Sequence, residues 1–157
     1  MAVTVTKAAQ IAAGARPYPI DDHGKIRILY GNITQVGAGD ATSSWIIGSL
    51  PPGRVRVLPH LSRYKVSALG TSRVMDIGHD AYTSLTEPND SAQTAAAPAA
   101  FADDIDVSGA THANFPVTGG LKHDMYSRDG IQLRATVAGG TIPDAATGEF
   151  LIAYVCE

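Results

Sequence analysis

Cysteine is almost absent from this sequence of 157 residues, in which Cys156 is the single example. One thiol cannot form an internal disulfide or a metal centre of clustered thiolates, and its place in an apolar run indicates a small buried residue. No apolar stretch reaches the roughly 18 residues of a membrane span, and the first residues lack a basic segment followed by an apolar run. We therefore expect no membrane partner and no secretory signal.

Charged residues are also scarce, at 17% of the chain. The 12 basic residues are dispersed singly or in pairs, and the formal net charge is -3. Nucleic-acid binding relies on clustered Lys and Arg that neutralise phosphates, so we expect no direct nucleic-acid partner. Aromatic residues make up only 6% of the chain, which leaves few ring faces on which sugars could stack.

Residues suited to catalysis and metal binding are present, but not in the patterns that such sites require. The five histidines form neither His-x-His nor His-Glu-x-x-His, and no Gly-x-Ser-x-Gly motif occurs. Asp103, Asp104 and Asp106 are the densest set of hard oxygen ligands, and the segment from Asp104 to Gly109 opens like a calcium loop. A calcium loop needs an acidic residue at its twelfth position, which is Phe115 here. We predict no enzyme activity, no cofactor and no metal, and keep the three aspartates as the metal-site candidate to test.

Apolar patterning through the rest of the sequence predicts β-strands. Residues 131–137 place Ile, Leu, Ala and Val on one face and Gln, Arg and Thr on the other, the period of a sheet with one wet side. Residues 150–156 are all apolar, so neither face of this strand prefers water. Eight or nine such segments recur every 8–12 residues or so, with turns such as Pro51-Pro52-Gly53 and Gly139-Gly140 between some of them. We therefore predict an all-β protein, a jelly-roll-like antiparallel β-sandwich of about eight strands.

Two stretches interrupt the strand rhythm. Residues 1–24 begin with a short alternating segment and continue with Ala- and Pro-rich chain, which we interpret as an extended N-terminal arm. Residues 86–100 are also rich in Ala, and we expect them to form a long loop of the kind that is usually functional or mobile. The expected organisation is an arm over residues 1–24 and one sandwich domain over residues 25–157 that carries the loop 86–100.

One short motif occurs twice. His79-Asp80-Ala81-Tyr82 and His123-Asp124-Met125-Tyr126 both have the form His-Asp-x-Tyr. Coincidence and a shared structural role are both compatible with a four-residue pattern that recurs once.

Several turn and strand motifs, taken in their order along the chain, resemble those of a family of tailed-phage virion proteins. They are Gly48-Ser-Leu50-Pro-Pro-Gly53-Arg-Val55, Met75-Asp76-Ile77-Gly78, Asp104-Ile-Asp106-Val-Ser108, Ser127-Arg-Asp-Gly130, Val137-Ala-Gly-Gly-Thr-Ile-Pro143 and Tyr154-Val155. The family is that of head decoration, or cement, proteins with a jelly-roll sandwich. The resemblance implies a structural protein, made in the host cytoplasm, that lies on the capsid surface and stabilises the capsid by bridging major capsid protein subunits.

A terminal strand that is apolar on both faces needs a second cover, which predicts a homo-oligomer, a trimer first and a dimer as the alternative. The interface candidates are Tyr18, Phe150, Leu151, Ile152, Tyr154 and Val155. The alternative function is a carbohydrate- or receptor-binding sandwich of a phage tail or fibre. In that case Tyr18, Tyr82 and Tyr126, which lie near expected loops, are the rings available for stacking on sugars.

Overall fold

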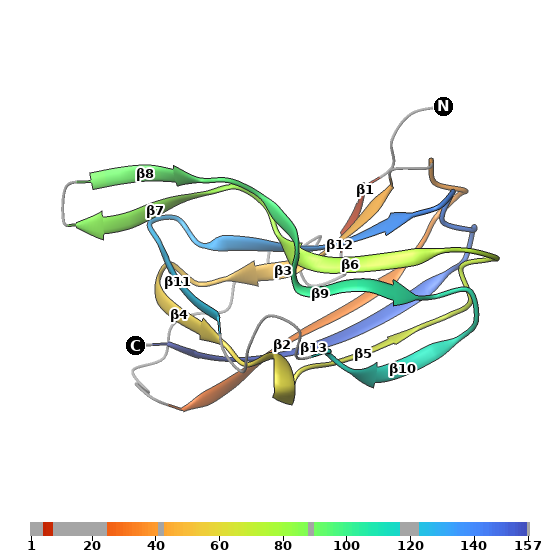
Figure 1. Cartoon of the computed structure of the whole chain (residues 1–157), viewed down its shortest axis with the longest axis horizontal. Coiled ribbons are helices and arrows are strands. Elements are labelled where there is room, and N and C mark those ends of the chain that lie inside the picture. Colours follow the sequence, from red (N-terminus) through yellow and green to blue (C-terminus); the bar gives the residue numbers. More distant parts are fainter. Residues whose placement is uncertain (1–4, 8–24, 41–42, 88–89, 117–122, 157) are drawn as a thin grey trace.

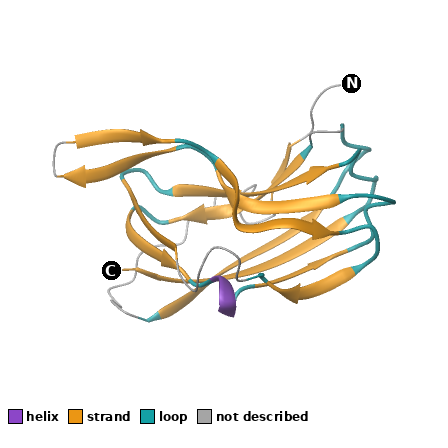
Figure 2. Cartoon of the chain, viewed as in Figure 1, coloured by secondary structure: helices purple, strands orange, loops and turns teal. Residues whose placement is uncertain are grey.

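Two β-sheets packed face to face make up the protein (Figure 1). This computed structural model describes residues 5–7, 25–40, 43–87, 90–116 and 123–156. Within these residues the short 3-10 helix η1 (Pro59–Leu61) is the single helical segment, and strands dominate (Figure 2). No helix among the described residues has the length and apolar character needed to cross a bilayer. The predicted all-β sandwich is confirmed.

The described residues form thirteen strands, more than the eight or so that apolar periodicity indicates. They are β1 (Val5–Lys7), β2 (Ile26–Thr34), β3 (Ser44–Leu50), β4 (Gly53–Val57), β5 (Arg63–Val66), β6 (Val74–His79), β7 (Tyr82–Glu87), β8 (Asp90–Thr94), β9 (Ala97–Asp106), β10 (Thr111–Asn114), β11 (His123–Ser127), β12 (Ile131–Ala138) and β13 (Thr147–Cys156). The additional strands include β8 and β10, whose polar sequences give no alternating signal because they bury little apolar surface.

One sheet has the strand order β1-β3-β12-β6-β9, and the other has the order β10-β5-β13-β4-β11-β7-β8 with β2 paired to β13. The pairings are antiparallel except for that of β1 with β3, which is parallel. The chain changes sheet repeatedly, for example between β3 and β4, between β5 and β6, and between β9 and β10. This alternation resembles that of jelly-roll sandwiches built from Greek keys.

β13, the strand expected from the apolar run at residues 150–156, lies in the middle of the larger sheet. It pairs with β2 along one side and with β5 and then β4 along the other. On its outer face, Ala153 is only 2% exposed, and beside it the chain around η1 fills the ladder between β5 and β4: the backbone N–H of Leu58 donates to the Ala153 carbonyl oxygen at 2.9 Å, and the N–H of Ala153 donates to Ser62 Oγ at 3.0 Å. The protein itself therefore supplies part of the second cover that the apolar sequence requires.

Most of the described residues between 86 and 100 form strands rather than the predicted long loop. They contain the end of β7, all of β8 and the beginning of β9. The β7–β8 hairpin continues the ribbon formed by β6 and β9 beyond the body of the sandwich (Figure 1). No strand signal is present in this part of the sequence because a projecting hairpin has no core face to fill, so Ala, Ser, Thr and Gln suffice.

The space between the sheets is filled by large rings. Trp45, Phe101, Phe115 and Phe150 are at most 2% exposed, and Trp45 packs edge to face against Phe150 with 6.2 Å between ring centroids. The Trp45 indole N–H donates a hydrogen bond of 2.9 Å to Oε1 of Gln35, which is itself buried. This bond satisfies the one polar group of the largest core side chain.

Gly78 lies where the backbones of β6 and β9 approach closely. Ile77 is opposite Ala102 while His79 is opposite Ala97, so two steps along β6 correspond to five along β9 and β9 bulges between them. A Cβ atom at position 78 would fall on the carbonyl oxygens of Ala97 and Pro98. Glycine is therefore required at this position for lack of space.

We predict that Gly78→Ala destabilises the protein by about 1–3 kcal/mol, because a backbone carbonyl cannot move aside as a flexible side chain can. At this chain length, each kcal/mol lowers the thermal midpoint by about 2–4 °C. The matched control is Gly109→Ala, where the new methyl group meets no atom within 4 Å. Thermal unfolding followed by circular dichroism measures both variants, and equal midpoints for the two would contradict the close approach of β6 and β9.

Candidate functional site

The interface candidates on β13 divide between its two faces. Phe150, Ile152 and Tyr154 point into the core, with exposed fractions of 0%, 0% and 3%. Their apolar character serves the packing of the sheets. Leu151 and Val155 lie on the outer face and are partly exposed. Of these five residues, only the outer two are available for a contact with another chain.

Exposed apolar side chains continue from these two residues onto β2. Ile26, Ile28 and Tyr30 are 56%, 59% and 43% exposed, and we call them the β2 stripe. In the β2–β13 ladder, Ile26 is opposite Val155 and Tyr30 is opposite Leu151. Contiguous exposed apolar groups of this kind mark sites of contact with other molecules.

At the Tyr30 end of the β2 stripe, an open groove of about 310 Å³ crosses β2, β13, β5 and β10. We call it the outer groove. Two cross-strand rows of outward side chains line it, Tyr30-Leu151-Arg63-Asn114 and Glu149-Lys65-His112. Lys65 Nζ lies 3.2 Å from Glu149 Oε1, and the hydroxyl of Tyr30 donates to Glu149 Oε2 at 3.5 Å. The groove therefore combines a ring, an aliphatic side chain and several hydrogen-bonding groups.

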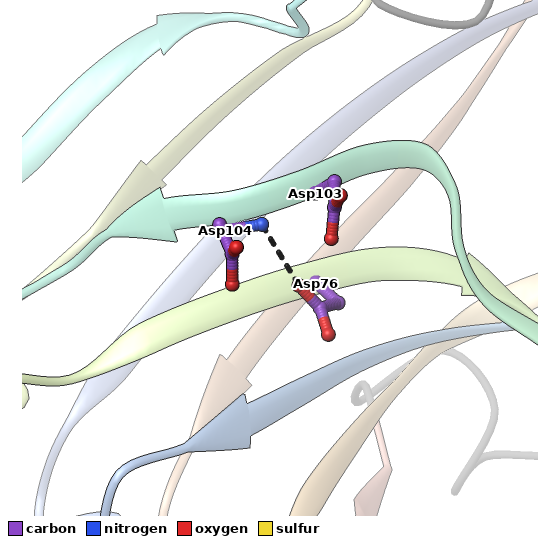
Figure 3. A group of neighbouring side chains, drawn as sticks. All are labelled: Asp76, Asp103 and Asp104. Carbon is purple, nitrogen blue, oxygen red and sulfur yellow. Dashed lines mark hydrogen bonds between the residues drawn. The ribbon is translucent and has the colours of Figure 1, made fainter.

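Three carboxylates meet on β6 and β9: those of Asp76, Asp103 and Asp104 (Figure 3). One oxygen from each lies within 4.8 Å of the others. The backbone N–H of Asp104 donates to Asp76 Oδ1 at 2.9 Å, which gives one of these oxygens a partner within the protein. Asp103 and Asp104 are exposed, so water can solvate their charges without a cation.

Asp106, the third aspartate of the sequence-based candidate, does not belong to this group. Its carboxylate accepts a hydrogen bond of 2.9 Å from the backbone N–H of Ser108. Hydrogen bonds from the Ser108 side chain and backbone lower the pKa of Asp106, as expected where a carboxylate closes a turn. Asp76 takes its place in the cluster, and only the pairing of β6 with β9 brings it there.

The two His-Asp-x-Tyr segments converge on one aromatic ring. His79 ends β6 and His123 begins β11, and their ring centroids lie 6.2 Å and 5.2 Å from that of Phe101. His79 also packs against Tyr82 at 5.3 Å, and its Nδ1 lies 2.9 Å from the carbonyl oxygen of Asp80. This geometry favours a shared structural role for the repeated motif over coincidence.

Each aspartate of the repeated motif accepts hydrogen bonds from an arginine side chain. Asp80 and Arg134 form a bidentate pair at 2.6 Å and 2.7 Å, and Asp124 accepts a hydrogen bond of 2.6 Å from Arg56. Hydrogen bonding to Asp80 raises the pKa of Arg134, and both side chains of the pair are 26% exposed. The Asp80–Arg134 pair joins the end of the β6–β9 ribbon to β12, at the root of the projecting hairpin.

We predict that EDTA leaves the thermal midpoint of the wild type unchanged, because the three carboxylates need no cation to be solvated. A cation at a hundred times its dissociation constant would contribute about 2.7 kcal/mol and would raise the midpoint by several degrees. The test compares wild type, an Asp76→Asn/Asp104→Asn variant and the control Asp106→Asn, each melted with calcium and with EDTA. A chelator effect in the wild type and in Asp106→Asn but not in the double variant would contradict the prediction.

We predict a loss of stability on acidification that depends on His123. Burial lowers the pKa of His123 below its usual 6.5, and the nearby His79 lowers it further against the opposing effect of Asp124. The unfolded chain therefore binds a proton more readily than the folded one, so this contribution to folding is intact above about pH 6.5 and declines as the pH falls below it.

Urea unfolding of wild type and His123→Gln between pH 8 and pH 5 measures this effect. The free energy of unfolding of the wild type should fall relative to that of the variant as the pH decreases. His112→Gln, which removes an exposed imidazole, controls for the substitution itself. Parallel pH profiles of wild type and His123→Gln would contradict the assignment.

Matches to known proteins come from the structure of this chain and not from its sequence. No protein-family model matches the sequence, and no curated protein matches it. The structure nevertheless matches a chain in the capsid of Ralstonia phage GP4, with a TM-score of 0.72 and 19% identity over 98% of this chain and 99% of that one. It also matches a chain in the capsid asymmetric unit of cyanophage Pam1, with a TM-score of 0.56 and 14% identity over 92% and 96% of the two chains. Over 98% and 92% of its length, respectively, the chain has the fold of these two phage capsid chains.

Proposed function

We propose that this protein is a structural component of a tailed-phage virion, which decorates the capsid surface and stabilises it by bridging major capsid protein subunits. The observation that carries the proposal is the end-to-end fold match to a chain in the capsid of Ralstonia phage GP4, which covers 98% of this chain and 99% of that one. The role requires no catalysis and no cofactor.

The surface suits a protein that works by contact. Charged residues make up only 17% of the chain, and large apolar side chains remain exposed on β2. A stable protein interface buries about 800 Å² on each partner, and many weak contacts of this kind can join neighbouring capsid subunits without any single strong site. The rigid two-layer body provides a fixed frame for such contacts.

The β7–β8 hairpin is the segment that we assign to the capsid contact. It extends beyond the sandwich, and two contacts near its base connect it to β11: the pairing of Ser84 with Ser127 and a hydrogen bond of 3.0 Å from the Arg128 N–H to the Thr83 carbonyl (Figure 1). Ala92 and Gln93 are exposed on it. The N-terminal arm, with Tyr18, is the second proposed contact, and residues 8–24 lie outside the described residues.

Self-association is the remaining part of the proposal, with a trimer as the first expectation and a dimer as the alternative. Ile26, Ile28 and Val155 are the residues that we assign to the contact between copies. Among the described strands, β2 pairs only with β13, so its other edge is open to a neighbour. Light scattering of the free protein gives the number of copies.

We predict that shortening the hairpin abolishes capsid binding while the fold is retained. Replacing residues 85–91 by Asn-Gly keeps the Ser84–Ala92 pair and closes it with a two-residue turn. The variant and the wild type are mixed with capsids that lack this protein, and the bound fraction is measured after sedimentation. Val36→Ser, at a side chain that is 81% exposed elsewhere on the surface, is the control and should bind normally.

The outcomes of this experiment separate the two parts of the proposal. Wild-type protein that fails to bind capsids, and is absent from purified virions by mass spectrometry, would contradict the virion role. Normal binding by the shortened variant would contradict only the assignment of the hairpin. The thermal midpoint of the variant should stay within a few degrees of that of the wild type, because Leu85 is the one large apolar residue in the replaced segment.

A further inference from the structure

Three polar side chains on the outer groove have no partner within the described part of the protein. Those of Arg63, His112 and Asn114 are exposed and make no hydrogen bond or ion pair with any described residue. Asn114 is opposite Arg63 in the β5–β10 ladder, and His112 is opposite Lys65. All three can donate hydrogen bonds to a molecule that lies in the groove.

Among the described residues that line the groove, Arg63 is the cation without an anionic partner. The carboxylate of Glu149 is shared between Lys65 at 3.2 Å and the Tyr30 hydroxyl at 3.5 Å. Arg63 has no such partner among the described residues. A planar guanidinium binds a carboxylate through two parallel N–H···O bonds, which an ammonium cannot do. The groove is therefore complementary to a ligand that carries an anionic oxygen group such as a carboxylate.

The remainder of the lining is apolar. The Tyr30 ring is 43% exposed, and Leu151 lies next to it on β13. Tyrosine presents an apolar ring together with a polar tip, and this combination suits ligands with both C–H and hydroxyl groups. The volume of about 310 Å³ lies at the lower end of the range for small-molecule sites, which are mostly apolar with a few placed polar groups.

The pairing of the strands beneath the groove favours a sugar over a peptide as the ligand. β13 is paired with β2 and β5, and β5 is paired with β13 and β10, so both strands have neighbours on each side. Their backbone groups are engaged in these ladders, whereas an extended peptide is usually bound by adding it to a free sheet edge. A ligand that lies over β13 and β5, between the open edges of β2 and β10, is recognised there by side chains, which favours a sugar that brings its own hydroxyl groups.

We propose that the outer groove binds an acidic sugar, a hexuronate unit of a polysaccharide. Arg63 binds the carboxylate, Asn114 and His112 donate to hydroxyl or ring oxygens, and one face of the sugar ring packs on Tyr30 and Leu151. The Tyr30 end of the groove lies about 13 Å along β2 from Ile26, at 3.3 Å per residue, so a self-contact around Ile26 leaves it open. This site goes beyond the virion role and does not depend on it.

Calorimetric titration with four probes tests the proposal: trigalacturonate, a hyaluronan tetrasaccharide, maltotriose and tetraglutamate. We expect at least one of the two uronate oligosaccharides to bind. Maltotriose should bind at least about tenfold more weakly, because a charge-assisted hydrogen bond is lost. Tetraglutamate should also bind more weakly, because it lacks the ring that packs on Tyr30. Failure of both uronates to bind, or equal binding of maltotriose or tetraglutamate, would overturn the proposal.

The variants Arg63→Gln and Tyr30→Ala should each weaken uronate binding by about tenfold. The larger sheet offers a matched pair of controls, because Arg54 and Tyr126 are cross-strand neighbours outside the groove and Tyr126 is 44% exposed. Arg54→Gln and Tyr126→Ala should leave the affinity unchanged. An equal loss in both pairs would indicate a general surface effect and would also overturn the assignment. Capsid binding, measured separately, is expected to survive all four substitutions.

Discussion

The pairing of β13 with three strands is the constraint on which the larger sheet depends. β2 accompanies it along nearly its whole length, while β5 and β4 divide the opposite side between them. This division brings β10 next to β5 at one end of the sheet and β11 next to β4 at the other. The outer groove and the Arg56–Asp124 pair therefore occupy separate regions of one face. Strands that pair directly with β13 contribute to both regions.

The sequence predicted the elements that fill the core and missed those that do not. Residues 131–137 and 150–156 are strands as expected, because alternation and continuous apolar runs report burial directly. A hairpin outside the core carries no such signal, so the sequence predicts a loop over residues 86–100. The extent of the two-layer sandwich could thus be inferred from the sequence, whereas its projecting ribbon could not.

The candidate sites depend on long-range register, which periodicity in one sequence does not contain. Asp103 and Asp104 are adjacent in the sequence, but their third partner Asp76 lies 28 residues from Asp104. The outer groove contains Tyr30, Arg63 and Glu149 because β2, β13 and β5 are neighbours in the sheet. That strand order cannot be read from the sequence. The repeated His-Asp-x-Tyr motif was visible in the sequence, but its common contact with Phe101 was not.

The β6–β9 pair and the β7–β8 hairpin form one ribbon, and its geometry determines how it bears load. A pull along its axis acts in shear on the interstrand hydrogen bonds, which resist together. A sideways push is instead concentrated at the root, where Phe101 packs on both histidines and Arg134 holds Asp80. A sideways push on the hairpin is therefore carried by these contacts together with those of Ser127 and Arg128 at its base.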